Sequence, residues 1–453
     1  MGEKMGLIAT GIPSLDKALA GGFSKGTSIL IAGNPGTGKT HLAIHILYNN
    51  LQKGLKGAYV SFAESKKQFY KNALESGVDF REMEKQGLFR FYDMLTMPRE
   101  EMKEFIDFLI RDLIEWQPEI VVFDSVTVVG QIFGEVMLRS FLHSIIGRIV
   151  NALDVLAILI GEIPYGEKRV GFGVEEFVVD GVIVLEMERK GEVIKRYLTI
   201  PKMRGRRIVK SAYEYIITNE GIDVLSVPEL EFTKRSIDTS ERFETGMPVL
   251  DDLIGGGLYK GSITMITGPT GSGKTILALT IASNMAKKGK NVLYITFEES
   301  IGAIQEAMTK LGLTGNIKIV AMVPEAKTPV QYYATIRKLL DETSSDVLVI
   351  DSLSAMKSHM DERDFIKALR YLQLLTKERG ITFILTHTSR SAEGFISTGF
   401  STLMDTIIVL DYQLPKHPGE SMERRILVLK SRHSEHKPLL KEFYIGEGGV
   451  IIE

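Results

Sequence analysis

Two glycine-rich segments have the residue types and the spacing of a phosphate-binding loop, G-x-x-x-x-G-K-[ST]. Each follows an apolar run and precedes a helical pattern. Glycines allow consecutive backbone N–H groups to surround phosphate oxygens at the start of a helix. A glycine-rich turn that fits by chance is the alternative, which two copies in the same context disfavour. The predicted ATP-binding residues are Gly33, Asn34, Pro35, Gly36, Thr37, Gly38, Lys39 and Thr40 in the first segment, and Gly268, Pro269, Thr270, Gly271, Ser272, Gly273, Lys274 and Thr275 in the second.

The last two residues of each loop have predicted roles of their own. Lys39 and Lys274 are expected to contact the β- and γ-phosphates of ATP. The hydroxyl groups of Thr40 and Thr275 are expected to bind Mg²⁺. The loops therefore predict two sites for magnesium-bound ATP.

Asp124 and Asp351 each end a run of apolar residues that is typical of a buried strand. A carboxylate at the carboxyl edge of a parallel sheet can hold the magnesium shell beside a phosphate-binding loop. We therefore add both aspartates to the predicted magnesium sites. Ordinary strand-ending caps are the alternative interpretation.

Hydrolysis also needs a carboxylate that orients or deprotonates the attacking group. The second copy offers Glu298 and Glu299, whereas the first has Ala63 and Glu64 at the corresponding positions. Neighbouring strand residues point to opposite faces, so Glu64 cannot replace the carboxylate absent at Ala63 unless the backbone turns there. The first copy is expected to bind ATP and to hydrolyse it slowly.

These motifs belong to a long internal repeat. The segment TGIPSLDKALAGGFSKGTSILIAGNPGTGKT from Thr10 recurs as TGMPVLDDLIGGGLYKGSITMITGPTGSGKT from Thr245, and PKMRG later corresponds to LKSRH. The copies start at Thr10 and Thr245, and this period is much longer than that of a solenoid repeat. It therefore indicates whole domains. The polar segment DVLSVPELEFTKRSIDTSERFE has no clear period and is read as a linker, which predicts domains at 1–230 and 231–453.

Short β-rich runs such as SILIAG and IVVFDS alternate with longer helical patterns in each copy. This alternation predicts the α/β class, with a mainly parallel sheet flanked by helices in each domain.

Composition excludes several functional classes. The 453 residues contain no cysteine, which removes disulfides, thiol nucleophiles and cysteine-bound metals. No apolar run is long enough for a membrane span or a secretory signal, so we expect a cytoplasmic protein. A net charge of −2 lacks the basic excess of a nucleic-acid-binding protein.

The order of these motifs resembles the RecA/RadA superfamily, and the tandem arrangement is similar to the KaiC family of ATPases. GVEEFVVDGVIVL with KMRG in the first copy, and LTHTS, FSTLMDTIIVL and the late K-x-R in the second, carry the resemblance. It implies two RecA-like P-loop domains. Low asparagine and glutamine content, with no cysteine, is typical of a heat-adapted source, such as an archaeon.

The resemblance further implies a hexameric ring with ATP between neighbouring subunits. Lys202 with Arg204, and Lys430 with Arg432, would then reach the nucleotide of the next subunit and stabilise the transition state. A solvated basic strand end is the alternative, because lysine and arginine are usually surface residues.

Ser401 and Thr402 match the hydroxyl pair that KaiC proteins phosphorylate in their second domain. The resemblance thus implies an ATPase with Ser/Thr autokinase activity that acts as a conformational switch read by a further protein. An ordinary loop pair is the alternative. A DNA-associated RecA-like ATPase is disfavoured by the even charge, although Arg390 supports it, and a small-molecule P-loop kinase fits the duplicated domain poorly.

Overall fold

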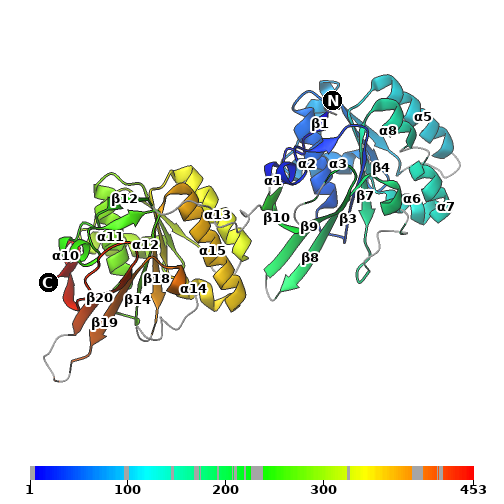
Figure 1. The fold of residues 1–453 in the computed structure, drawn as a ribbon. Helices are drawn as coiled ribbons and strands as arrows, with labels where there is room; N and C mark the ends of the chain where they lie inside the picture. The colour runs from blue at the N-terminus through cyan, green and yellow to red at the C-terminus, as the bar shows by residue number, and fades with distance from the viewer. Residues whose placement is uncertain are drawn as a thin grey trace. The chain divides into compact units, whose positions relative to one another are not determined.

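The computed structural model describes residues 6–95, 102–143, 147–167, 173, 175–190, 193–206, 208, 212–218, 221–225, 238–323, 327–389, 401–415, 417 and 422–453. The chain divides into two compact units, Met1–Ser226 and Val227–Glu453, and each is described by itself. Figure 1 shows that each unit is a sheet with helices on both faces.

The first unit contains a nine-stranded sheet in the order β11-β10-β9-β8-β3-β7-β6-β4-β5. Strands from β8 to β5 in this order pair in parallel, and β8 to β11 pair in antiparallel fashion. The strands are β3 (Ser28–Gly33), β4 (Gly57–Ser61), β5 (Phe89–Asp93), β6 (Ile120–Asp124), β7 (Leu156–Glu162), β8 (Gly181–Lys190), β9 (Val193–Met203), β10 (Ala212–Thr218) and β11 (Gly221–Leu225), with β1 (Leu7–Ile8) and β2 (Phe23–Ser24) forming a separate pair.

Alternating strand residues supply the cores on the two faces of this sheet. Ile29 and Ile31 of β3 pack in one apolar cluster with residues of α2, whereas Leu30 and Ala32 pack in the other with residues of α5. The helices are α1 (Pro13–Ala18), α2 (Lys39–Leu51), α3 (Lys66–Glu75), α4 (Phe80–Lys85), α5 (Met102–Trp116), α6 (Val126–Phe133), α7 (Glu135–Phe141), α8 (Gly147–Leu153) and α9 (Glu175–Val178).

The second unit repeats the topology, with strand order β16-β15-β17-β18-β14-β19-β20-β21-β22. The predicted α/β class, with two tandem, mainly parallel sheets flanked by helices, is therefore confirmed. The strands are β14 (Ile263–Gly268), β15 (Val292–Thr296), β16 (Ile317–Ala321), β17 (Val347–Asp351), β18 (Thr382–Thr388), β19 (Thr406–Gln413), β20 (Glu423–Ser431), β21 (Lys441–Gly446) and β22 (Gly449–Ile452), with β12 (Asp238–Phe243) and β13 (Leu258–Lys260) forming a separate pair. The helices are α10 (Pro248–Leu253), α11 (Lys274–Lys287), α12 (Ile301–Lys310), α13 (Pro329–Thr343), α14 (Leu353–Ser358) and α15 (Glu362–Arg379), with a short 3₁₀ helix η4 (Ser401–Leu403).

Both glycine-rich loops lie at the carboxyl ends of central parallel strands. β3 pairs with β7 and β8, and β14 pairs with β18 and β19. This edge of an open α/β sheet is where ligands bind in such folds. Along the described residues, every helix is too short or too polar to cross a membrane.

Candidate nucleotide-binding sites

The first phosphate-binding loop joins β3 directly to α2. Gly36 and Gly38 have φ of 79° and 90°, which favours glycine, and Gly38 is the residue before the helix. A Cβ at Gly33 would lie 2.3 Å from the carbonyl oxygen of Leu185, so a larger residue would not fit. Lys39 donates from Nζ to the carbonyl oxygen of Asn34 at 3.1 Å. The loop therefore has the backbone that a phosphate cradle needs.

Lys39 is 7% exposed, and burial lowers the pKa of its ammonium group, while the charges of Glu162 and Asp124 act in the opposite direction. A buried ammonium group is stabilised when anionic groups lie close to it. Phosphate oxygens would supply an anionic partner for this ammonium group in addition to the Asn34 carbonyl oxygen.

Asp124 lies at the end of β6, on the side of the sheet that α2 covers. Its Oδ2 accepts hydrogen bonds from Thr40 Oγ1 at 2.8 Å and from the Tyr59 hydroxyl at 2.5 Å. Burial raises the pKa of Asp124, and the two hydrogen bonds oppose that rise. The structure thus brings together the threonine and the aspartate predicted to bind Mg²⁺, and their hard oxygen donors fit that ion.

The second loop has the same construction between β14 and α11. Gly271 and Gly273 have φ of 82° and 100°, and Lys274 donates to the carbonyl oxygen of Pro269 at 2.9 Å. Burial lowers the pKa of Lys274, against the charges of Asp351 and Glu298.

Asp351 is held differently from Asp124. The Tyr294 hydroxyl donates to its Oδ2 at 2.8 Å, as Tyr59 does in the first unit, but its Oδ1 accepts from Thr386 Oγ1. Thr275 is the second residue of α11, as Thr40 is of α2. Both oxygens of the second aspartate therefore have a protein donor.

The predicted catalytic carboxylate of the second unit has a defined position. Glu298 Oε1 accepts a hydrogen bond from Ser352, the residue after Asp351. Thr296 Oγ1 receives the backbone N–H of Glu299 at 3.0 Å and so shapes the turn after β15. Burial raises the pKa of Glu299, with the charges of Asp351 and Glu298 adding to the effect.

The first unit differs at the same place. Ala63 offers no carboxylate, and Ser125, which corresponds to Ser352, has a buried Oγ without a hydrogen-bond partner among the described residues. The backbone does turn after β4, because Ser61 Oγ binds both the N–H and the carbonyl of Glu64. Glu64 nevertheless accepts from Asn72 Nδ2 at 2.8 Å. Burial, followed by the charge of Asp124, raises the pKa of Glu64.

A cavity of about 290 Å³ adjoins the first loop. It extends from the loop into the space between α2 and α3. A nucleotide held at the loop by its phosphates could place other parts of the molecule there. It is lined by Gly36, Gly38, Lys39, Thr40, His41, Ile44, Asn72 and Ser76.

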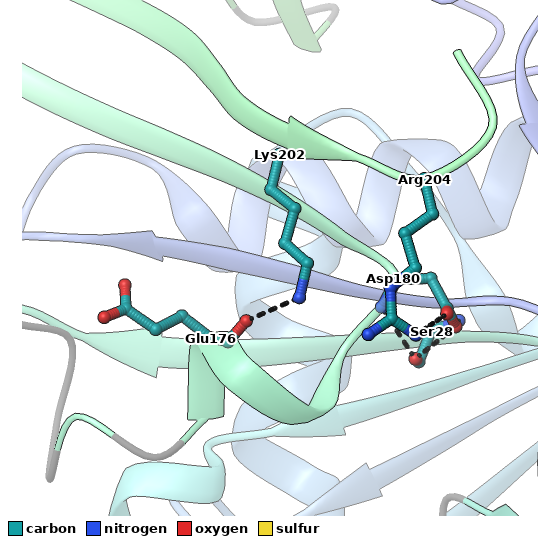
Figure 2. Close-up of polar contacts among 5 residues, drawn as sticks. All are labelled: Ser28, Glu176, Asp180, Lys202 and Arg204. Carbon is teal, nitrogen blue, oxygen red and sulfur yellow. Dashed lines mark hydrogen bonds and ion pairs between the residues drawn. The ribbon is translucent and has the colours of Figure 1, made fainter.

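The first K-x-R pair contacts its own unit in the isolated chain. Lys202 Nζ donates to the carbonyl oxygen of Glu176 at 3.0 Å, and Arg204 Nη1 lies 3.1 Å from Asp180 Oδ1 (Figure 2). Asp180 also accepts from the Ser28 hydroxyl at 2.8 Å, so it joins Arg204, the residue after β9, to the first residue of β3. The side chain of Arg204 remains 62% exposed.

The second pair has a parallel arrangement. Lys430 Nζ donates to the carbonyl oxygens of Ser401 at 3.4 Å and Met404 at 2.7 Å, and Arg432 Nη2 donates to that of Thr402 at 2.9 Å. The predicted phosphorylation pair therefore lies against the predicted basic pair. Arg390 lies outside the described residues.

Reasoning from sequence missed several residues of these sites. Tyr59 and Tyr294 open the repeated segments YVSFAES and YITFEES, so the repeat itself was a signal for them. A serine follows the strand-end aspartate in both copies, Ser125 in the first and Ser352 in the second. Thr386 lies in the segment LTHTS, but only the sheet register places it beside Asp351.

Comparisons with known proteins give one family and several relatives for this chain. The family described as ATPase: KaiC matches residues 8–229 and 243–453. The Circadian clock oscillator protein KaiC of Picosynechococcus sp. is 31% identical over 469 residues, covering 98% of this chain and 89% of the relative. The protein of the same name from Synechococcus elongatus is 30% identical over 467 residues, with 98% and 89% coverage.

Proposed function

Since this chain belongs to the KaiC family of ATPases, we propose that it is a ring-forming ATP hydrolase in which the second unit performs most of the hydrolysis and the first mainly binds nucleotide. ATP binding and hydrolysis belong to the family. The division of labour between the two units is the finer proposal.

One observation carries this proposal. Ser352 donates a hydrogen bond to Glu298 beside Asp351, whereas the corresponding Ser125, near Ala63, has no hydrogen-bond partner in the part of the chain that the structure describes. In hydrolysis, a water oxygen bonds to the γ-phosphorus and the bond from that phosphorus to the bridging oxygen breaks. A carboxylate that orients this water and takes its proton accelerates the step by about 10²–10⁴-fold.

The remaining site residues bind and orient ATP. Lys39 and Lys274 bind phosphate oxygens, and the glycine loops supply backbone N–H groups. Thr40 with Asp124, and Thr275 with Asp351, would hold Mg²⁺, which neutralises phosphate charge when bound.

We further propose a homo-oligomeric ring, a hexamer, in which the K-x-R pairs reach a neighbouring subunit's nucleotide. Arg204 and Arg432 have side chains that are 62% and 42% exposed, so both can change partners at low cost. Nucleotide state would then alter subunit packing, and another protein would read that conformational change.

Autophosphorylation of Ser401 or Thr402 is a second proposed activity. Thr402 is exposed on η4, and Lys430 and Arg432 lie against the backbone of this segment. Phosphate adds about −1.5 to −2 charges beside these two cations, which is a suitable input for a switch in ring packing.

Matched lysine variants test the division of labour. Lys274→Ala should remove most steady-state ATP turnover, whereas Lys39→Ala should mainly weaken the ring, as measured by light scattering in magnesium-ATP. Loss of most turnover in Lys39→Ala with an intact ring would contradict the division of labour. A monomeric unaltered protein would contradict the ring.

A further inference from the structure

The strand next to each phosphate-binding loop ends differently in the two units. Glu162 ends β7 opposite Gly33, and Thr388 ends β18 opposite Gly268. The backbone N–H of Glu162 donates to Thr127 Oγ1 at 2.9 Å, and that of Thr388 donates to Ser354 Oγ at 2.7 Å. The strand register and the backbone hydrogen bond to a hydroxyl group therefore show that Glu162 and Thr388 occupy equivalent positions in the two units.

The next residue strengthens this equivalence. The N–H of Ile163 donates to the carbonyl of Gly33 at 3.0 Å, and the N–H of Ser389 donates to that of Gly268 at 3.1 Å. In both units the chain after this strand thus runs along the first residue of the phosphate-binding loop.

Strand alternation places Glu162 on the face that carries the nucleotide residues. Ile158 and Ile160 of β7 pack in the apolar cluster that contains the α2 side chains. Side chains two residues apart share a face, so Glu162 lies on the α2 side, as Asp124 does at the end of β6. β7 lies between β3 and β6 in the sheet. The Glu162 carboxylate therefore comes from the strand between the phosphate-binding loop, which follows β3, and Asp124, which ends β6.

Two carboxylates act on each loop lysine, but one of the two comes from a different strand in each unit. Asp124 and Glu162 are the acidic groups that act on Lys39, and Asp351 and Glu298 are those that act on Lys274. Each lysine therefore has its strand-end aspartate and one further carboxylate. In the second unit the further carboxylate follows β15, and in the first unit it ends β7.

The segment after Glu162 is held against the loop by side-chain hydrogen bonds. Asn34 Nδ2 donates to the carbonyl oxygens of Ile163 at 2.9 Å and Pro164 at 3.3 Å, and the Tyr165 hydroxyl donates to that of Pro35 at 3.1 Å. Pro269 replaces Asn34 in the second unit and has no side-chain donor. These contacts hold the segment that follows Glu162 against the loop where phosphate would bind.

We infer that Glu162 is the carboxylate that orients and deprotonates the attacking water at the first nucleotide site, in place of the group absent at Ala63. This inference rests on the proposed function and accounts for the slow turnover assigned to the first unit. Water oxygen bonds to the γ-phosphorus, the bond to the bridging oxygen breaks, and the water proton passes to Glu162. ADP and phosphate leave, and the proton passes to solvent. Glu64 is less suited because Asn72 already binds its carboxylate.

The test uses the full chain with Glu298→Gln, which leaves turnover to the first unit. Adding Glu162→Gln should reduce the remaining turnover by about 10²-fold, whereas Glu167→Gln, an exposed acid of the same segment, should change it less than about twofold. The dissociation constant of a fluorescent ATP analogue should stay within about threefold. Adding Ala63→Glu to the Glu162→Gln protein should restore turnover.

Three results would overturn the inference: no turnover in Glu298→Gln, residual turnover that Glu162→Gln does not change, or a loss that follows weaker analogue binding. Near-normal turnover in Glu298→Gln alone would instead contradict the dominant role of the second unit. In that case Glu162→Gln still reports on Glu162 separately.

Discussion

The two units share a strand order and a phosphate-binding loop but differ in the carboxylates around them. Tyrosine donates to the strand-end aspartate in both, through Tyr59 and Tyr294. The serine that follows the aspartate has an acceptor in the second unit, Glu298, and none among the described residues of the first. The two units therefore share the residues proposed to bind ATP and differ in the carboxylate proposed to act in hydrolysis.

The aspartates show the same divergence in a second way. Asp124 receives both of its donors on one oxygen, whereas Asp351 receives one donor on each oxygen. The difference arises because Thr386 lies beside Asp351 where the first unit has Ile160, opposite Asp124. The second aspartate is thus oriented more completely by protein.

The largest expected effect comes from removing Glu298. Glu298→Gln should reduce total ATP turnover by about 10²-fold, to the level that the first unit sustains, because it removes the carboxylate proposed to orient the attacking water. Glu299→Gln is the matched control and should cost less than about tenfold, since Glu298 is the residue that accepts the hydrogen bond from Ser352 beside Asp351. Steady-state phosphate release measures both, and equal losses would remove the special role of Glu298.

Phosphorylation should also distinguish the units. Lys202 contacts the backbone of Glu176 as Lys430 contacts that of Ser401, so the first unit has Glu176 and Phe177 where the second has its hydroxyl pair. Incubation with magnesium-ATP should add phosphate to Ser401 or Thr402 only, and Glu298→Gln should suppress it. Peptide mass spectra test this, and an unmodified peptide from an actively hydrolysing protein would reduce the pair to loop hydroxyls.

Much of this comparison could be predicted from the sequence. The repeat carried the loops, the aspartates and the contrast between Ala63 and Glu298, because those features lie at nearly constant spacing. Glu162 could not be found that way, because the spacing between the copies changes before β7 and pairs it with the wrong residue. The intrachain partners of Lys202 and Arg204 were also hidden, since they depend on how β9 lies against α9 and Asp180.

A smaller effect should appear in stability without nucleotide. Asp124→Asn can keep both donors on its single remaining oxygen, whereas Asp351→Asn would place an N–H₂ group toward Tyr294 or Thr386. Asp351→Asn should therefore lower the free energy of unfolding by about 1 kcal/mol more than Asp124→Asn. Denaturant unfolding compares them, and an equal cost would show that the second oxygen of Asp351 contributes little.

The smallest effect concerns a feature that the units share. Burial lowers the pKa of His45 to about 4 and that of His387 to about 4. An imidazole that stays neutral in the folded state but is protonated when unfolded stabilises the fold at neutral pH, and this is lost as pH falls from about 6.5 to about 4. His45→Gln should make the melting temperature less sensitive to pH in that range. An unchanged slope would contradict the burial of a neutral His45.

Moving the carboxylate between units tests the central claim most directly. The double variant Ala63→Glu, Glu298→Gln gives Ser125 an acceptor and removes the one from Ser352. Its steady-state turnover should exceed that of Glu298→Gln alone by at least about tenfold, and adding Lys39→Ala, not Lys274→Ala, should abolish it. Turnover that stays at the Glu298→Gln level, or that still depends on Lys274, would contradict the account.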